Sequence, residues 1–177
     1  MKNYSKNLMT LTLTLLMGLF CIQSMAQEKA PPASPPATAK QTVGSKTITI
    51  DYSQPSVKGR DIWNAEGKLA PYGQVWRTGA NATTTIDFSD DVKVEGKSVP
   101  KGKYGLFTIP GQKEWVIIIN KGIKWGAYTY KQEEDVVRVT VPAKKAKSFQ
   151  EKFTIDISKK GVVSLMWADA QADFTVK

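Results

Sequence analysis

Apolar and polar residues alternate in several short segments of this chain, and this pattern predicts β-strands. The alternation is clear at residues 47–52 (TITIDY), 137–141 (VRVTV), 153–157 (FTIDI) and 174–177 (FTVK). A period of two turns one apolar face toward a core and leaves a polar face in water. Residues 115–119 (WVIII) are apolar at every position, which predicts a central strand that is covered on both faces.

Turn sequences separate these segments at short intervals. Pro110-Gly111 fits the middle of a type II turn, and Pro100 and Gly102 fit a type I turn. Such spacing predicts an all-β fold, a single antiparallel sandwich or a jelly-roll-like barrel. At most one short helix is expected, at Ala143–Gln150. The side chains expected in the core are those of Trp115, Ile117, Ile119, Val139, Ile155, Leu165 and Phe174.

The first 26 residues have the pattern of a cleaved signal peptide. Lys2 and Lys6 precede an apolar run over Leu8–Ile22, and Ser24-Met25-Ala26 offers small residues for cleavage. The run is too short to indicate a membrane anchor, so none is expected after cleavage. Lipidation at Cys21 is the weaker alternative because Phe20 replaces the small residue that should precede it. We expect a periplasmic or secreted protein.

Residues 27–45 are rich in proline and alanine, a composition that favours extended polyproline II and cannot build a core. We interpret them as a linker, with a disordered N-terminal segment as the alternative. Residues 46–177 then form one β domain, long enough to bury a core without disulfides or metal.

Composition excludes much catalytic chemistry. The chain has no histidine, and its single cysteine lies in the leader, so the mature domain lacks an imidazole base, a thiolate and the usual zinc ligands. No cofactor and no metal are expected. Without Lys2 and Lys6, Lys and Arg fall from 25 to 23 and the net charge from +9 to +7. A surface rich in lysine explains this charge, and export argues against nucleic acid as a partner.

Acidic residues do not select a catalytic pair. Glu133–Asp135 and Asp90-Asp91 are expected in solvated loops. A glycosidase needs two carboxylates about 5–10 Å apart, and the spacing of the remaining acids favours no particular pair. The acids that could contribute are Asp51, Asp61, Glu66, Asp87 and Asp156.

Pro71–Thr85 (PYGQVWRTGANATTT) is the densest unusual stretch. The guanidinium group of Arg77 matches a carboxylate, phosphate or sugar edge, and Trp76 beside it offers a face for stacking. The alternative is that Trp76 and Tyr72 are core residues and that Arg77 closes a loop on backbone carbonyls.

This stretch and the later PKGKYGLFTIP and WGAY segments closely resemble a family of secreted bacterial β-rich domains of unknown function. The resemblance runs from about Lys46 to the C-terminus and implies export and a single β-rich domain. Members are sometimes labelled asparagine synthetase, which needs a cysteine nucleophile and a nucleotide loop that this chain lacks.

The leading hypothesis is an exported, non-catalytic module that binds a polar ligand of the cell envelope, with a glycan as one candidate. A two-carboxylate hydrolase and a structural or chaperone-like protein acting through a sheet edge are the alternatives. An enzyme is the less favoured class, and oligomeric state is left open. The predicted ligand-binding residues are Arg60, Trp76, Arg77, Asn81, Tyr104 and Trp125.

Overall fold

The computed structural model describes residues 32–64, 69–123 and 130–177, most of which belong to one compact unit, Ala33–Lys177. This unit is built almost wholly from β-strands and has no α-helix among its described residues, so the predicted all-β antiparallel fold is confirmed. In the described ranges, no helix has the length and hydrophobicity needed to cross a membrane. The elements are β1 (Pro36–Val43), β2 (Lys46–Ser53), β3 (Thr85–Phe88), β4 (Val92–Val94), β5 (Lys97–Val99), β6 (Gly102–Ile109), β7 (Glu114–Asn120), the 3₁₀ turn η3 (Gln132–Glu134), β8 (Asp135–Ile157) and β9 (Val162–Thr175).

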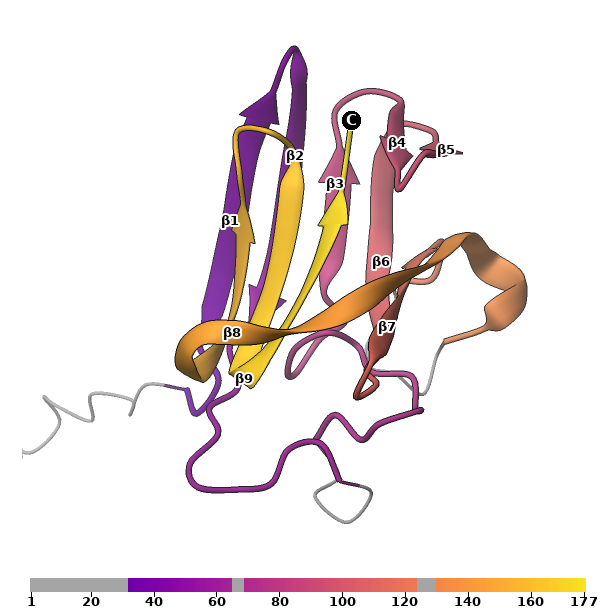
Figure 1. The fold of residues 1–177 in the computed structure, drawn as a ribbon. Helices are drawn as coiled ribbons and strands as arrows, with labels where there is room; N and C mark the ends of the chain where they lie inside the picture. The colour runs from indigo at the N-terminus through magenta and orange to yellow at the C-terminus, as the bar shows by residue number, and fades with distance from the viewer. Residues whose placement is uncertain (1–31, 65–68, 124–129) are drawn as a thin grey trace, which may run out of the picture. The chain divides into compact units, whose positions relative to one another are not determined.

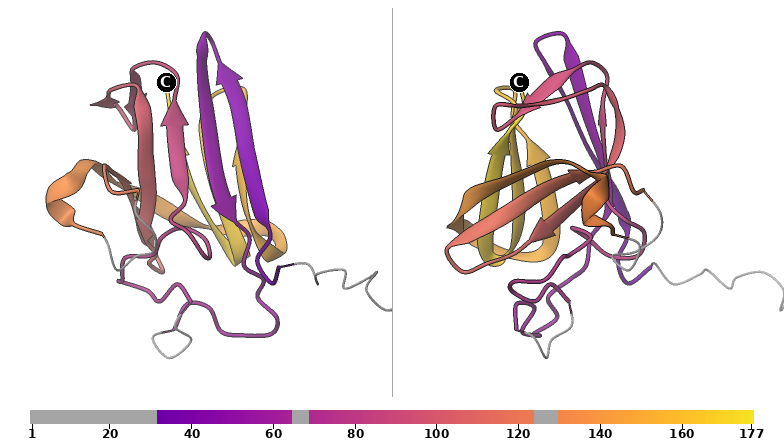
Figure 2. Two further views of the ribbon diagram at one scale, coloured as in Figure 1. Left: turned by 180° about the vertical axis from the view of Figure 1, so that it is seen from behind. Right: turned by 90° about the vertical axis from the view of Figure 1, so that its right-hand side faces the viewer.

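Seven strands form one antiparallel sheet in the order β1-β2-β3-β6-β7-β8-β9, and β4 and β5 form a second, small sheet. The large sheet curls into a half-barrel, so that the β8–β9 hairpin stands opposite β1, β2 and β3 (Figures 1 and 2). An isolated bridge between Ser56 and Lys152 joins the two walls. The apolar faces of the strands therefore meet inside the curl.

Strand β8 corrects one expectation. Ala143–Gln150, the predicted position of a short helix, lies within this 23-residue strand. Its pairing with β9 shifts register between Lys145 and Gln150 and again before Thr154. Such bulges bend a strand, and the bend lets β8 pass from one wall of the half-barrel to the other. The segment lacks the apolar stripe that would stabilise a helix, so pairing with β9 determines its conformation.

Strand β1 corrects a second expectation. Its residues, 36–43, fall inside the predicted linker but pair with β2 along their whole length, from Pro36 opposite Ser53 to Val43 opposite Lys46. Pro36 is tolerated because it opens an edge strand. Ala37, Ala39 and Val43 pack partly buried against the core. The sequence suggested a linker because these side chains are small and two are alanines.

The core contains all seven residues predicted for it, each at most 8% exposed. Ile117 and Ile118 point to opposite faces of β7 and are both fully buried, which confirms a strand covered on both faces. Ile118 lies opposite Phe107 of β6, and the ring of Phe107 packs 5.2 Å from that of Tyr130. An aromatic cluster fills the interior near the start of β7; its members are Trp63, Trp76, Trp115, Phe153 and Trp167.

Candidate functional site

Most of the unusual Pro71–Thr85 stretch serves the architecture. Trp76 is 4% exposed, stacks on Trp167 and donates from Nε1 to the carbonyl oxygen of Gly79 at 3.1 Å. The hydroxyl of Thr84 donates to the carbonyl of Thr78 at 2.7 Å, and both threonines are fully buried. Because its ring is enclosed, Trp76 offers no surface on which a ligand could stack. This corrects its predicted role.

Gly79 allows the backbone between Trp76 and Thr84 to pack closely against Thr84 and Ser53. Its φ is +158°, and a Cβ atom there would lie 2.8 Å from Oγ1 of Thr84 and 3.1 Å from the carbonyl oxygen of Ser53. Asn81 follows with φ of +59°, a region that asparagine tolerates. Its side-chain amide donates to the carbonyl of Ser34 at 3.2 Å. Asn81 therefore ties the segment before β1 to the loop.

Two more of the predicted ligand residues bond to the backbone. Arg60 donates from Nε to the carbonyl of Val57 at 3.0 Å and from Nη2 to that of Ser56 at 2.6 Å. Tyr104 donates its hydroxyl to the carbonyl of Pro100 at 3.0 Å. Both side chains thus brace local turns, and the structure does not bring them together with Asn81. Trp125 lies outside the described residues.

Arg77 differs from the other predicted residues. Its neighbour Trp76 bridges Thr108 of β6 and points into the core, so Arg77, the next residue on an extended segment, points to the opposite face. Its Nε atom is buried and has no hydrogen-bond partner among the described residues. This nitrogen therefore does not serve as the backbone clasp that we considered as the alternative. Its role in binding stays a prediction.

A second aromatic of the stretch, Tyr72, is exposed and was not among the predicted ligand residues. The residue is 36% exposed, and its ring stacks on Trp63, with centroids 5.7 Å apart and planes inclined by 6°. Trp63 in turn packs edge-on against Trp115 and Trp167 of the core. The exposed ring thus rests on a fixed aromatic support.

Backbone hydrogen bonds hold Tyr72 in place. Its amide donates to the carbonyl of Trp63 at 3.0 Å, and the amide of Gly73 donates to that of Pro110 at 2.9 Å. The carboxylate of Asp61 accepts from the amides of Trp63 and Asn64, which fixes the turn that carries Trp63. These hydrogen bonds hold the stacked pair of Tyr72 and Trp63, which we call the Tyr72 platform, in a fixed position.

Tyr72 borders a pocket of about 290 Å³. Polar residues from three other segments also line it: Gln112 from the β6–β7 turn, Lys144 and Lys145 from β8, and Asp169 from β9. Ala168, with φ of +51°, interrupts the alternation of β9, and such an irregularity re-aims the side chain that follows it. Asp169 is exposed as a result, while Trp167 and Ala168 are both buried. Sequence spacing gives no signal that would group these residues.

Electrostatics at this pocket are mixed. Burial raises the pKa of Tyr72, and the negative charges of Asp169 and Asp61 raise it further, so its hydroxyl is neutral at physiological pH. Burial also acts to raise the pKa of Asp173, but hydrogen bonds from Gln171, Lys144 and Ser164 outweigh it and lower the pKa. Lys144 lies 2.9 Å from that carboxylate. Lys144, which lines the pocket, is therefore paired with a carboxylate that does not line it.

Two further pockets lie where β4, β5 and the C-terminal end of β9 meet, one of about 450 Å³ and one of about 210 Å³. Each of the three pockets is lined by one acidic residue: Asp169, Asp91 or Glu95. None of them offers the acid pair that a two-carboxylate hydrolase requires. Within the described ranges, no group of three or more histidine, cysteine or acidic residues is placed to hold a metal.

Comparison with known proteins gives one match. The sequence model of the family "Protein of unknown function (DUF2911)" matches residues 34–176. Searches among curated proteins and among solved structures found no match. The matched range begins before β1, which agrees with the inclusion of that strand in the domain.

Proposed function

This chain belongs to the family of proteins of unknown function DUF2911, and we propose that its β domain is an exported, non-catalytic module that binds a saccharide. The observation that carries the proposal is the exposed ring of Tyr72, supported by Trp63 and bordered by the polar pocket. A sugar ring has an apolar face of C–H groups and a rim of hydroxyl groups. An aromatic face beside a few polar side chains complements both.

The rim of the pocket provides the hydrogen-bonding groups that such a ligand needs. The amide of Gln112 can donate and accept, and the carboxylate of Asp169 accepts. Lys144 and Lys145 also line the pocket, with the ammonium group of Lys144 paired to Asp173. A volume of about 290 Å³ lies at the lower limit for ligand pockets, so only a small part of a glycan would enter it. The rigid support of Tyr72 reduces the entropy that binding would cost.

Binding is favoured over hydrolysis because this pocket holds a single exposed carboxylate, Asp169. Asp173, the next acid on β9, is paired with Lys144. Glycoside hydrolysis by two carboxylates requires one acid and one base or nucleophile across the scissile bond. A lone carboxylate beside an aromatic platform is instead suited to recognition.

The test is binding to insoluble peptidoglycan, chitin and cellulose, followed by calorimetry with soluble oligosaccharides of the glycan retained. Tyr72→Ala should abolish binding, whereas Tyr72→Trp should keep it because the platform is retained. Gln112→Ala should weaken it about tenfold, the loss of one good hydrogen bond. Phe149→Ala is the matched control because Phe149 is an aromatic residue exposed by 61% outside this pocket. Equal binding by wild type and Tyr72→Ala, or no retention on any of the three glycans, would reject the proposal.

Export is the second part of the proposal. It rests on the charged start, the apolar run over Leu8–Ile22 and the small residues before Gln27. Mass spectrometry of the protein from an envelope fraction should find an N-terminus at or next to Gln27. A full-length cytoplasmic species or a lipid-modified Cys21 would contradict it.

A further inference from the structure

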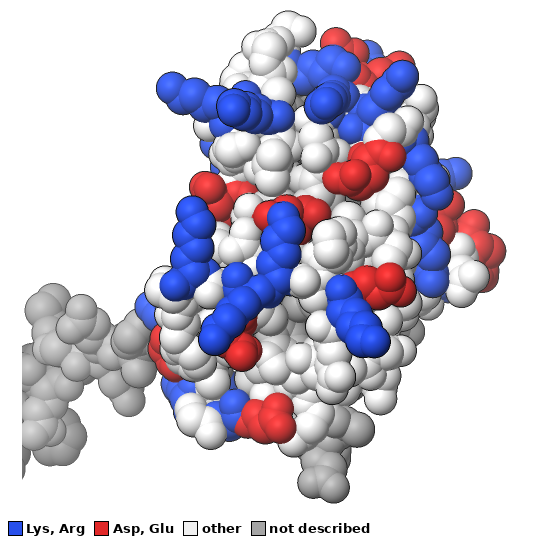
Figure 3. All heavy atoms as spheres, in the orientation of Figure 1, with Lys and Arg blue, Asp and Glu red and all other residues white. Residues whose placement is uncertain are grey.

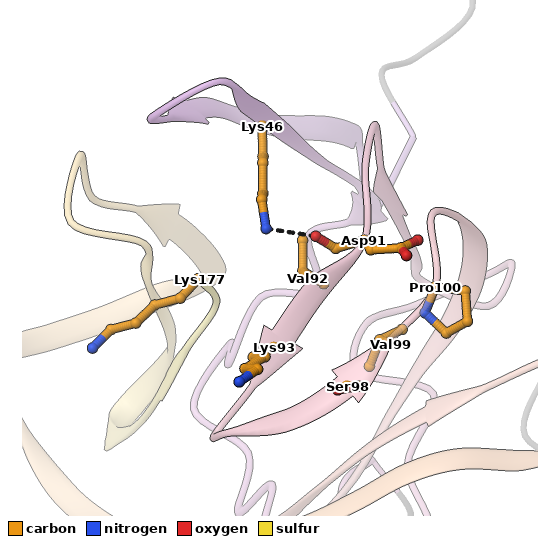
Figure 4. Close-up of a pocket in the computed structure, with 8 residues that line it drawn as sticks. All are labelled: Lys46, Asp91, Val92, Lys93, Ser98, Val99, Pro100 and Lys177. Carbon is orange, nitrogen blue, oxygen red and sulfur yellow. Dashed lines mark hydrogen bonds between the residues drawn. The ribbon is translucent and has the colours of Figure 1, made fainter.

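A lysine-lined pocket lies at the opposite end of β6 from the Tyr72 platform. Pro100, just before β6, lines this pocket, whereas Gly111, just after β6, lines the other. Three lysines line it: Lys46 at the start of β2, Lys93 on β4 and Lys177 after β9 (Figure 4). Lysine and arginine side chains also gather at this upper end of the molecule in Figure 3. The volume is about 450 Å³, and Val92 and Val99 contribute apolar lining.

Backbone pairing places two of these lysines, Lys93 and Lys177, directly opposite each other. The amide of Lys93 donates to the main-chain oxygen of Lys177 at 2.7 Å, and the amide of Lys177 donates to that of Lys93 at 3.0 Å. Residues that exchange both hydrogen bonds lie directly opposite each other, with their side chains on the same face. Like charges in this arrangement destabilise a sheet, and an anion bound beside the ammonium groups would reduce that repulsion.

The neighbouring acids form no ion pair with these two lysines among the described residues, and Glu95, which lines the adjoining pocket with both of them, places one negative charge beside their two positive charges. Oδ1 of Asp91 accepts from the amide of Lys101 at 2.9 Å, and its carboxylate points away from the lysines in Figure 4. Oε1 of Glu95 accepts from the amide of Thr175 at 2.5 Å. The ion pairs among the described residues involve none of the three pocket lysines.

Lys46 adds a third positive charge at a fixed position. Its Nζ donates to the carbonyl oxygen of Asp91 at 2.6 Å, a contact drawn in Figure 4. One such bond uses one of the three donors of an ammonium group and leaves two. The carbonyl thus anchors the side chain at the pocket without cancelling its charge.

We propose that Lys46, Lys93 and Lys177 form a binding site for a phosphate-bearing ligand. Lysine binds phosphate as a point charge, whereas planar carboxylates are better matched by the arginine fork, and no arginine lines this pocket. A phosphate dianion has enough charge to accept from two ammonium groups at once. The pocket volume leaves room for a second phosphate or an attached group.

The probe is inorganic pyrophosphate, titrated into the whole mature protein at low salt and followed by calorimetry and by amide chemical shifts. The amides of Lys93 and Lys177 should shift on addition. Replacing Lys93 or Lys177 with Gln should weaken binding about tenfold each, since a hydrogen bond to a charged group is worth about 1.5 kcal/mol or more. Lys93→Gln should also raise the melting temperature without pyrophosphate because it removes the like-charge repulsion.

Lys113→Gln is the matched control: it removes one exposed positive charge beyond the other end of β6 and should leave pyrophosphate affinity unchanged. Equal weakening by all three substitutions would show a response to net charge alone and would overturn the site. Absence of binding to pyrophosphate would overturn it as well. Tyr72→Ala should leave pyrophosphate affinity unchanged, so this proposal can fail or succeed independently of saccharide binding.

Discussion

The hydroxyl oxygen of Tyr52, on β2, accepts a hydrogen bond from the backbone amide of Ile155, on β8, at 3.1 Å. The two residues are 103 positions apart and belong to opposite walls of the half-barrel. The ring of Tyr52 also meets Phe153 edge-on, with centroids 5.7 Å apart. A side chain thus supplies the acceptor that a neighbouring strand would otherwise provide.

Removing that hydroxyl tests how the walls are joined. Tyr52→Phe should lower the free energy of unfolding by about 1–3 kcal/mol because the buried amide of Ile155 loses its acceptor. Urea denaturation measures the change. Tyr104→Phe removes a hydroxyl bonded in an exposed setting and should cost less than about 0.5 kcal/mol. If the two variants lost the same free energy of unfolding, the hydrogen bond between the walls would contribute no more to stability than an exposed one.

Strand β7 supplies the strongest test of the core. Ile117→Ala should cost about 2–5 kcal/mol because the side chain is fully buried and leaves a cavity. Ile123, which is 50% exposed, is the control, and its replacement by alanine should cost less than about 0.5 kcal/mol. A loss below about 0.5 kcal/mol for Ile117→Ala would contradict the central position of β7.

Arg60 and Arg77 should respond in opposite ways to the same substitution. Arg60→Met removes two hydrogen bonds to backbone carbonyls and should cost about 1 kcal/mol. Arg77→Met removes a charged group whose buried Nε has no partner among the described residues, so stability should stay within about 0.5 kcal/mol or increase. Thermal melts measure both. A large loss for Arg77→Met would make Arg77 a structural residue and remove it from the ligand hypothesis.

Asp173 should contribute to acid sensitivity. Because its pKa is lowered in the folded protein, its stabilisation is complete above its unfolded pKa of about 4 and is lost as the pH falls through the lower folded value. Asp173→Asn should cost up to about 1 kcal/mol at pH 7 and progressively less in acid. Asp156→Asn, at an exposed strand position, is the charge-matched control. An unchanged difference between wild type and Asp173→Asn across this range would contradict the prediction.

The strands that the sequence predicted are those with strong alternation, such as residues 47–52, or continuous apolar character, such as residues 115–119. Strand β1 was missed because Ala37 and Ala39 carry too little apolar surface to show a pattern, and pairing with β2 decides their conformation. Ala143–Gln150 was misassigned because its neighbours along the chain did not reveal the partner strand, β9. The pattern of apolar residues along the chain therefore predicts which side chains are buried, but it does not identify the partner of each strand.

The candidate site was less accessible to sequence reasoning for the same reason. Trp76 and Tyr72 stand four positions apart in one stretch, yet the first is enclosed and the second is exposed. The difference comes from Trp63, which lies beneath Tyr72, and from Trp167, which stacks on Trp76. The Lys93–Lys177 pair likewise depends on contact between segments far apart in the chain. No spacing rule within the sequence would connect them.

The pairing of β1 with β2 has a practical consequence for shortened forms of this protein. A chain that starts at Lys46, as the composition of the preceding residues suggests, would lack β1 and leave β2 at the rim of the sheet. The bared strand would carry unpaired amides beside Ile48, Ile50 and Tyr52, all of them core residues. Exposed apolar edges of this kind recruit other chains. Such a fragment should therefore self-associate, whereas one that begins before Ala33 should remain dispersed.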